Sequence, residues 1–390
     1  MGSLVTGLLA YLFFIASTRS LGAAAAAPVT VLWTYWSLAA AALTFPLQHW
    51  IAHSVAADGA EAAVRRALPK VAAVVVVGAV VAGGAAWAAR EALFQRDDLW
   101  FPLLIAAVTV GSALTGVVRG GLSARHRFLA VAAALVAENA LRCLGVLALV
   151  LAQARQAVAY GICLAAGALA VLCWPSALRF SAGHGTGGTS SVLRFLGGAA
   201  GGQLIAQSVL TVAPVLLALL GGSPAEVTAV FAGLALFRAP YTVALGLVSQ
   251  LTGRITAMVA AGGRSALARV RVAVWAASAI GTVAAAAAGA VAGSELIRFV
   301  FGSGVDLPRW ACGLLAAGSA LALANLVLGV LVLAQARSAV TVRAWLIGCA
   351  AGAVVLVAAS AGPLERTCWA FLVAEAVAFV SLVVGEARRA

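Results

Sequence analysis

The residues best placed to do chemistry are the few ionisable side chains that fall inside long apolar segments. Arg238 lies in the middle of the apolar segment 226–250, and the nearest acid on that segment is Glu226, more than three turns away. A charge in lipid is costly and usually faces a cavity or a partner. Arg238 therefore predicts either an ion pair with another helix or a binding site or gate for an anionic ligand. Pro240 follows and predicts a kink, because it leaves a backbone carbonyl unpaired.

A second group of polar residues lies within the apolar segment 128–152. Glu138 and Arg142 are spaced i, i+4 with the acid first, which is the better orientation for a pair, and Asn139 lies beside them. The simpler interpretation is a self-neutralised pair that stabilises packing. The alternative is a cavity wall in which Arg142 meets a phosphate group and Glu138 tunes it.

Polar residues in the second half of the chain extend this pattern. Glu375 lies in the last apolar segment with no base within two turns, so it is a candidate for coupling to H⁺ or Na⁺, or a neutral packed side chain. Gln203 and Gln207 share one face of the seventh segment. Pro214 lies further along, so we expect this segment to bend and line a cavity. Both glutamines and Asn325 are expected to make interhelical hydrogen bonds.

Signatures of catalysis, cofactors and metals are missing. The sequence has no Gly-x-Ser-x-Gly and no His-Glu-x-x-His, and its single lysine, Lys70, follows Pro69, which excludes a P-loop. A literal Gly-x-Gly-x-x-Gly at 183–188 follows no predicted strand. The six cysteines have no zinc-site spacing. We predict no enzyme, no cofactor and no bound metal.

The composition requires a lipid environment. The chain is 64% hydrophobic and only 9% charged, with a mean hydropathy of +1.08, whereas soluble domains are about 25% charged. The apolar runs are continuous rather than alternating, which favours helices over a barrel. The net charge of +13 comes from bases between apolar runs rather than from a basic stripe with aromatics. We therefore expect no binding of nucleic acid.

The apolar pattern predicts an all-α polytopic membrane protein with about twelve transmembrane helices. Sixteen of the basic residues fall in alternate connections, against seven in the others, so the N- and C-termini are expected to be cytoplasmic. No base precedes the first run, so it is read as a helix and not as a signal peptide. The expected spans are 2–18, 29–52, 71–89, 99–118, 128–152, 157–175, 195–220, 226–250, 270–293, 310–334, 339–361 and 365–385.

A Gly/Ser/Thr-rich stretch divides the chain in the middle. The segment SAGHGTGGTSS predicts a cytoplasmic linker over 181–194. It separates an N-terminal six-helix lobe, 1–180, from a C-terminal six-helix lobe, 195–390. Two such halves are typical of a transporter with a cavity between bundles.

Several segments resemble one known family in order and spacing. The second half carries GGQLIAQ (201–207), a Pro-Ala-Glu helix start, Arg-x-Pro at 238–240 and a basic loop, followed by FVFGSGVDLP (299–308) and LAQAR (333–337). In the first half STRSLGA (17–23) and the text of 118–142 match as well. The chain resembles the polysaccharide-exporting, O-antigen-type flippases of the multidrug/oligosaccharidyl-lipid/polysaccharide (MOP) exporter superfamily. It departs from them at 251–254, where their usual proline is missing.

This resemblance implies alternating access between two lobes around a basic cavity in the cytoplasmic membrane of a bacterium. The cargo would be a polyprenyl-phosphate-linked saccharide, as in polysaccharide or lipopolysaccharide synthesis. The driving force would be an ion gradient or the supply of substrate, and the working unit a monomer. The arginines that would meet the phosphate are Arg238 and Arg142, with Arg19, Arg119 and Arg254 nearer the openings.

Three other classes stay open. A drug or cation antiporter of the same superfamily would need an acidic, aromatic cavity, and Glu138 and Glu375 are the acids within apolar segments. A polymerase or ligase for lipid-linked sugars would need a large outer loop. A non-transporting membrane scaffold would keep the same fold.

Overall fold

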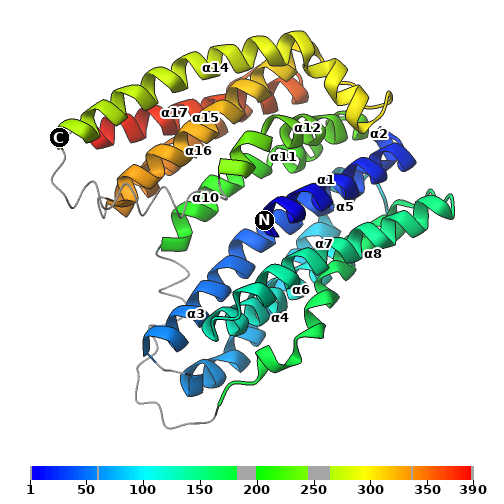
Figure 1. Cartoon of the computed structure of the whole chain (residues 1–390). Helices are drawn as coiled ribbons and strands as arrows, with labels where there is room; N and C mark the ends of the chain where they lie inside the picture. The colour runs from blue at the N-terminus through cyan, green and yellow to red at the C-terminus, as the bar shows by residue number, and fades with distance from the viewer. Residues whose placement is uncertain (1, 59–60, 182–198, 245–263, 335–336, 388–390) are drawn as a thin grey trace. The chain divides into compact units, whose positions relative to one another are not determined.

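The computed structural model describes residues 2–58, 61–181, 199–244, 264–334 and 337–387, and these residues form helices and no strand (Figure 1). They fall into two compact units, Met1–Leu204 and Ile205–Ala390. Each unit is a bundle of helices and is described by itself.

Unit 1 is built from long helices joined by short connections. α1 packs on α7, whereas α3 and α4 both pack on α6, so α6 is the central helix of this unit. Its elements are α1 (Gly2–Leu21), α2 (Ala23–Ala39), the π-helix η1 (Ala40–Thr44), α3 (Phe45–Asp58), α4 (Glu61–Ala88), α5 (Arg90–Phe94), α6 (Trp100–Ala124), α7 (Phe128–Leu151), α8 (Ala157–Ala166) and the 3₁₀ turns η2 (Gly167–Cys173) and η3 (Pro175–Leu178).

The second span of unit 1 is one helix with a bulge. Gly22, with φ +81°, ends α1 and lets the chain start again as α2. Helical backbone then runs through η1 into α3, and the π-turn adds a residue to one turn. At the end of this bulge Thr44 donates a hydrogen bond of 2.8 Å to the carbonyl of Ser112 on α6. The bulge thereby ties the second span to the central helix.

Two glycines of α6 let these helices approach closely. A Cβ at Gly116 would lie 2.8 Å from the Thr44 carbonyl oxygen, and one at Gly120 would lie 2.9 Å from Cβ of Ile51. Both distances are too short for a real side chain, so glycine is required. Small residues four apart are a common device for close helix packing in membranes.

Unit 2 contains the longest helix of the described residues. α14 packs along α15, and α17 packs against both α15 and α16 (Figure 1). Its elements are α10 (Ala199–Thr211, which begins in unit 1), α11 (Ala213–Leu219), α12 (Pro224–Phe237), α14 (Arg264–Phe301), α15 (Arg309–Ala334), α16 (Ser338–Ala358) and α17 (Pro363–Ala387).

The start of α12 follows directly from its sequence. Ser223 accepts a hydrogen bond from the Glu226 backbone, the Glu226 carboxylate accepts one from the Ser223 backbone, and Pro224 occupies the first turn. This capping box satisfies N–H groups that would otherwise be unpaired.

The predicted fold class and membrane location are confirmed. Eight helices among the described residues are long and apolar enough to cross a membrane, and Val5–Leu21, Ala157–Cys173 and Pro224–Phe237 are shorter apolar helices. The chain is a multi-pass α-helical membrane protein.

Two expected spans are interrupted by proline. The segment 195–220 breaks at Val212, between α10 and α11. Within 226–250, α12 ends at Phe237, and helical backbone resumes over 239–244. The expected linker 181–194 lies, apart from Ser181, outside the described residues, so the lobe boundaries and the cytoplasmic termini stay predictions.

Candidate functional site

The polar residues of α7 converge on one fully buried guanidinium. Nη2 of Arg142 donates a hydrogen bond of 2.6 Å to the Glu138 carboxylate, and Nη1 donates one of 3.2 Å to the Asn139 side chain. Nε donates a third, of 2.9 Å, to the carbonyl of Leu164 on α8. Arg142 and Glu138 are only 1% and 4% exposed. The i, i+4 spacing therefore forms a buried ion pair.

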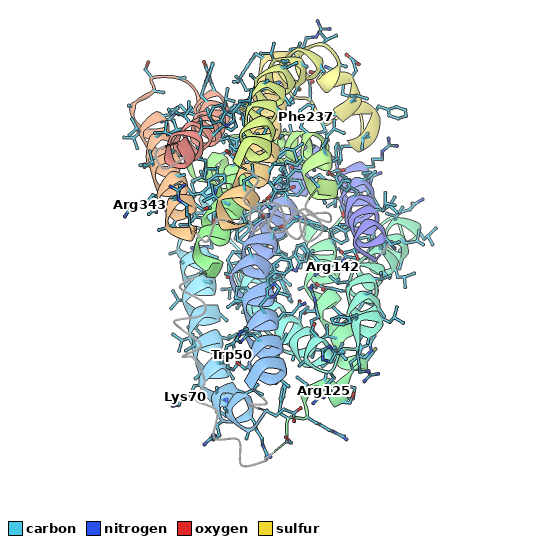
Figure 2. All side chains as sticks on the ribbon, turned by 60° about the vertical axis from the view of Figure 1, so that its left-hand side comes forward. Trp50, Lys70, Arg125, Arg142, Phe237 and Arg343 are labelled. Carbon is cyan, nitrogen blue, oxygen red and sulfur yellow. The ribbon has the colours of Figure 1, made fainter. Side chains whose placement is uncertain are left out.

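The ring of Trp36 and the backbone at Gly167 both lie close to this guanidinium. Cζ of Arg142 lies 4.2 Å from the ring centroid of Trp36 on α2, a cation–π contact. On η2, a Cβ at Gly167 would collide with Nε of Arg142. In Figure 2, Arg142 lies among the helices of unit 1, whereas Lys70 and Arg125 lie near one end of them. Since each guanidinium nitrogen has a partner in unit 1, the charge of Arg142 is compensated internally.

Arg119 differs from its sequence-based prediction. We expected it in a loop after a span ending at residue 118, but α6 continues to Ala124 and buries Arg119 to 6% exposure. The apolar run ends at Val118, yet Gly121 and Leu122 continue the helix because both pack against neighbouring elements. Its guanidinium lies 5.6 Å from the Phe45 ring centroid.

In unit 2, Arg238 follows directly after α12 and bonds to a carbonyl that a proline has left free. Nη1 donates a hydrogen bond of 2.6 Å to the Leu210 carbonyl, and Nε donates one of 3.1 Å to that of Leu234. Pro214 is four residues after Leu210 and has no N–H, so the helix itself cannot satisfy the Leu210 carbonyl. Arg238 therefore caps the break between α10 and α11.

Glu375 is the buried acid of unit 2. It is 0% exposed on α17, and Nδ2 of Asn325 on α15 donates hydrogen bonds of 2.8 Å to its Oε2 and 3.0 Å to its backbone carbonyl. Oε1 of Glu375 and Oδ1 of Asn325 have no hydrogen-bond partner within the described part of the chain. Arg238 and Tyr241 interact electrostatically with this carboxylate. The expected interhelical hydrogen bond of Asn325 is present, and Oε1 of Glu375 and Oδ1 of Asn325 are the two oxygens available to a ligand.

The other predicted site residues are dispersed. Gln207 is half-buried on α10, Arg19 is exposed in the last turn of α1, and Gln203 belongs to α10 with its side chain outside the described residues. Arg254 lies outside the described residues altogether. Among those described, no group of His, Cys, Asp and Glu could hold a metal ion.

Sequence reasoning missed a buried polar face of α6. Thr109, Ser112, Thr115 and Arg119 are all at most 6% exposed. Their spacing of three and four residues places them on one helix face. The signal that could have found this face is the spacing of hydroxyl residues, three and four apart, within an apolar run. Trp36 was not predicted either, because its contact with Arg142 depends on how two distant helices pack.

The pair on α7 makes a direct prediction. Arg142→Met should lower the free energy of unfolding by about 3–5 kcal/mol, because it leaves Glu138 buried and unpaired. Adding Glu138→Met should recover most of that loss. Denaturant unfolding in detergent micelles measures both, and equal or greater loss in the double variant would contradict the pairing.

The cap in unit 2 makes a second prediction. Arg238→Met should cost about 1.5–3 kcal/mol, the value of a hydrogen bond from a charged donor. In a Pro214→Ala background the cost should shrink, because the alanine supplies the backbone N–H that the Leu210 carbonyl lacks. A double-mutant cycle of unfolding free energies measures the coupling. Strictly additive costs would show that Arg238 does not cap this break.

The sequence matches no family model and no curated protein. Its structure is similar to an inward-facing MATE-family multidrug resistance transporter of the MOP superfamily, with a TM-score of 0.69, 13% identity and coverage of 98% of this chain and 94% of that one.

Two further solved structures are similar. An outward-facing MATE-family transporter has a TM-score of 0.59 at 12% identity, covering 99% of this chain and 93% of that one. A MOP superfamily transporter from Pyrococcus furiosus, described with a binding pocket of reverse polarity, has a TM-score of 0.62 at 13% identity and the same coverages. At these identities the likeness concerns the fold: the chain has the fold of MATE-type transporters of the MOP superfamily.

Proposed function

We propose that this protein is an ion-coupled membrane transporter that exports organic, cationic solutes by alternating access, with Glu375 as its coupling carboxylate. Two observations support transport. The fold is that of solved transporters seen facing inward and facing outward. Each unit also buries ionisable side chains within its apolar helices. This is the antiporter alternative of the sequence analysis, moved to first place by the structural neighbours.

The open carboxylate of Glu375 carries the proposal. A buried carboxylate needs either a proton or a cation, because an isolated negative charge in a low-dielectric interior is very costly. Asn325 fixes one oxygen of Glu375 and leaves the other, together with its own amide oxygen, without a protein partner in the described residues. The free carboxylate oxygen can take up a proton, and two oxygen ligands suit a hard cation such as Na⁺.

The acid of unit 1 is arranged differently. Glu138 is held at 2.6 Å by Arg142, whose remaining nitrogens are bonded to Asn139 and Leu164. A carboxylate with a permanent guanidinium partner has no need of a proton or a metal cation. We therefore assign coupling to unit 2 and a structural role to the α7 pair, and we place the hinge of unit 2 at Pro214 and Pro240.

Flipping of a polyprenyl-phosphate-linked saccharide is the second candidate. Buried Arg119 favours it, because an anionic headgroup that crosses lipid needs compensating positive charge. Two further arginines expected to meet the phosphate, Arg142 and Arg238, already donate hydrogen bonds to groups within their own units. Under either candidate the protein acts as a transporter and not as an enzyme.

Transport by reconstituted protein tests the proposal. In proteoliposomes, a proton or sodium gradient should drive movement of a cationic dye such as ethidium, followed by its fluorescence. Glu375→Gln should reduce gradient-driven movement to the level of protein-free liposomes, because an amide binds neither ion as a carboxylate does. Glu365→Gln is the matched control, since it removes an exposed carboxylate from the first turn of the same helix.

The same liposomes separate the two candidates. Movement of a fluorescent polyprenyl-diphosphate-linked glycan without movement of dye would reject the antiporter and favour flipping. Equal dye transport by Glu375→Gln and by the control would reject Glu375 as the coupling group. Movement of neither probe would favour the non-transporting scaffold.

A further inference from the structure

Arg119 is a buried charge whose guanidinium makes no hydrogen bond to the described residues. It is 6% exposed in the interior of α6, its Nε is buried without a partner, and no hydrogen bond or ion pair of its guanidinium occurs in the described part of the chain. A buried polar group of this kind is rare, and a buried charge is rarer, because each loses its hydration without compensation. Arg119 is therefore the buried cation of unit 1 whose chemistry calls for an anionic partner.

The surroundings of Arg119 contain further unmatched polar atoms. Thr115 lies one turn earlier on the same face of α6, is 2% exposed, and its hydroxyl has no partner in the described residues. On α3, the side-chain oxygen of Gln48 has no partner in the described residues, whereas its Nε2 donates a hydrogen bond of 3.5 Å to the Ser123 hydroxyl on α6. Phe45 and His49 lie on the same face of α3 as Gln48 and are exposed, so they mark the side from which a ligand can enter.

The charges near Arg119 do not balance. Glu138 interacts electrostatically with Arg119 and also accepts the direct hydrogen bond of Arg142. One carboxylate therefore faces two guanidinium groups, and the imbalance is one positive charge. Because Arg142 holds Glu138 at 2.6 Å, the unsatisfied charge belongs to Arg119.

The position of Arg119 is rigid. Gly116 and Gly120 flank it in the α6 sequence, and their missing side chains bring α6 against η1 and α3. The backbone at Arg119 is thus fixed beside α3, and its guanidinium lies 5.6 Å from the ring centroid of Phe45 on that helix. A cation held in this way is arranged in advance for an anion, since little conformational freedom is lost when the anion binds.

We propose that Arg119, with Thr115 and Gln48, forms a binding site for an oxyanion of the phosphate or sulfate class, either a free ion or the headgroup of an anionic lipid. The planar guanidinium offers two parallel donors, which match two oxygens of one oxyanion. The Thr115 hydroxyl supplies a further donor. Reversal of the Gln48 side-chain amide turns its Nε2 toward the anion, and its Oε1 then accepts from the Ser123 hydroxyl in place of the present bond. The site lies within unit 1 and requires no transport step.

Binding can be tested on the full-length protein in detergent. Sodium sulfate is titrated at constant ionic strength, with chloride as the balancing ion, and the unfolding temperature is followed by tryptophan fluorescence. Sulfate should raise the unfolding temperature of the wild type. In Arg119→Gln the apparent affinity should fall about tenfold or more, which corresponds to loss of one charge-assisted hydrogen bond.

Three variants give the test its controls. Thr115→Val removes only the hydroxyl and should weaken sulfate binding less than Arg119→Gln does. Arg119→Lys keeps the charge without the paired donors and should be intermediate, which separates binding from folding if Arg119→Gln unfolds. Arg343→Gln removes an exposed arginine from α16 in unit 2 and should leave the sulfate response unchanged (Figure 2).

A second arm identifies the source of the anion. Native mass spectrometry with phosphatidylglycerol counts the lipid molecules retained by the wild type and by Arg119→Gln. Loss of one retained lipid in Arg119→Gln assigns the site to a headgroup, whereas an effect of sulfate alone assigns it to a free ion. The proposal is overturned if Arg119→Gln and Arg119→Lys match the wild type in both arms, or if chloride stabilises the protein as well as sulfate does.

Discussion

The high free-energy cost of an unpaired charge inside a membrane protein is the constraint on which the rest of the structure depends. Each unit meets it with its own side chains. In unit 1, Arg142 gives every guanidinium nitrogen a partner, including Glu138. In unit 2, Arg238 donates to main-chain carbonyls, and Asn325 holds one oxygen of Glu375. Some buried polar atoms have no partner among the described residues, such as Nε of Arg119 and Oε1 of Glu375. These atoms point to function, because an unpartnered buried polar atom does not stabilise the fold.

Breaks in the helices supply part of this compensation. Pro214 removes an N–H and frees the Leu210 carbonyl, which then accepts a hydrogen bond from Arg238 at 2.6 Å. Glycines tighten the packing instead. Gly116 and Gly120 have no side chain, which allows the backbone of α6 to approach η1 and α3 closely. Both residue types occur where the apolar pattern would otherwise specify plain, straight helices. We therefore expect the backbone to move at Pro214 and Pro240 and to be rigid at Gly116 and Gly120.

The sequence predicts what depends on local spacing and fails where helix packing decides. Long apolar runs predict the spans, and the i, i+4 spacing predicts the pair of Glu138 and Arg142. The predicted end of the fourth span, at residue 118, was wrong, because packing extends α6 to Ala124 beyond the apolar run. The partners of Arg238 and Glu375 could not be predicted from local spacing. Leu210 is 28 positions from Arg238, and Asn325 is 50 positions from Glu375.

We propose that Glu375 binds and releases a proton or a cation, whereas Glu138 is permanently paired with Arg142. Infrared difference spectroscopy of the reconstituted protein tests it most directly, because a buried protonated carboxyl group has its own C=O absorption. We predict that lowering the pH in the absence of sodium produces such a band, that it is missing in Glu375→Gln, and that it is retained in Glu365→Gln. A band that persists in Glu375→Gln, or a wild type with no titrating buried carboxyl group, would contradict the account.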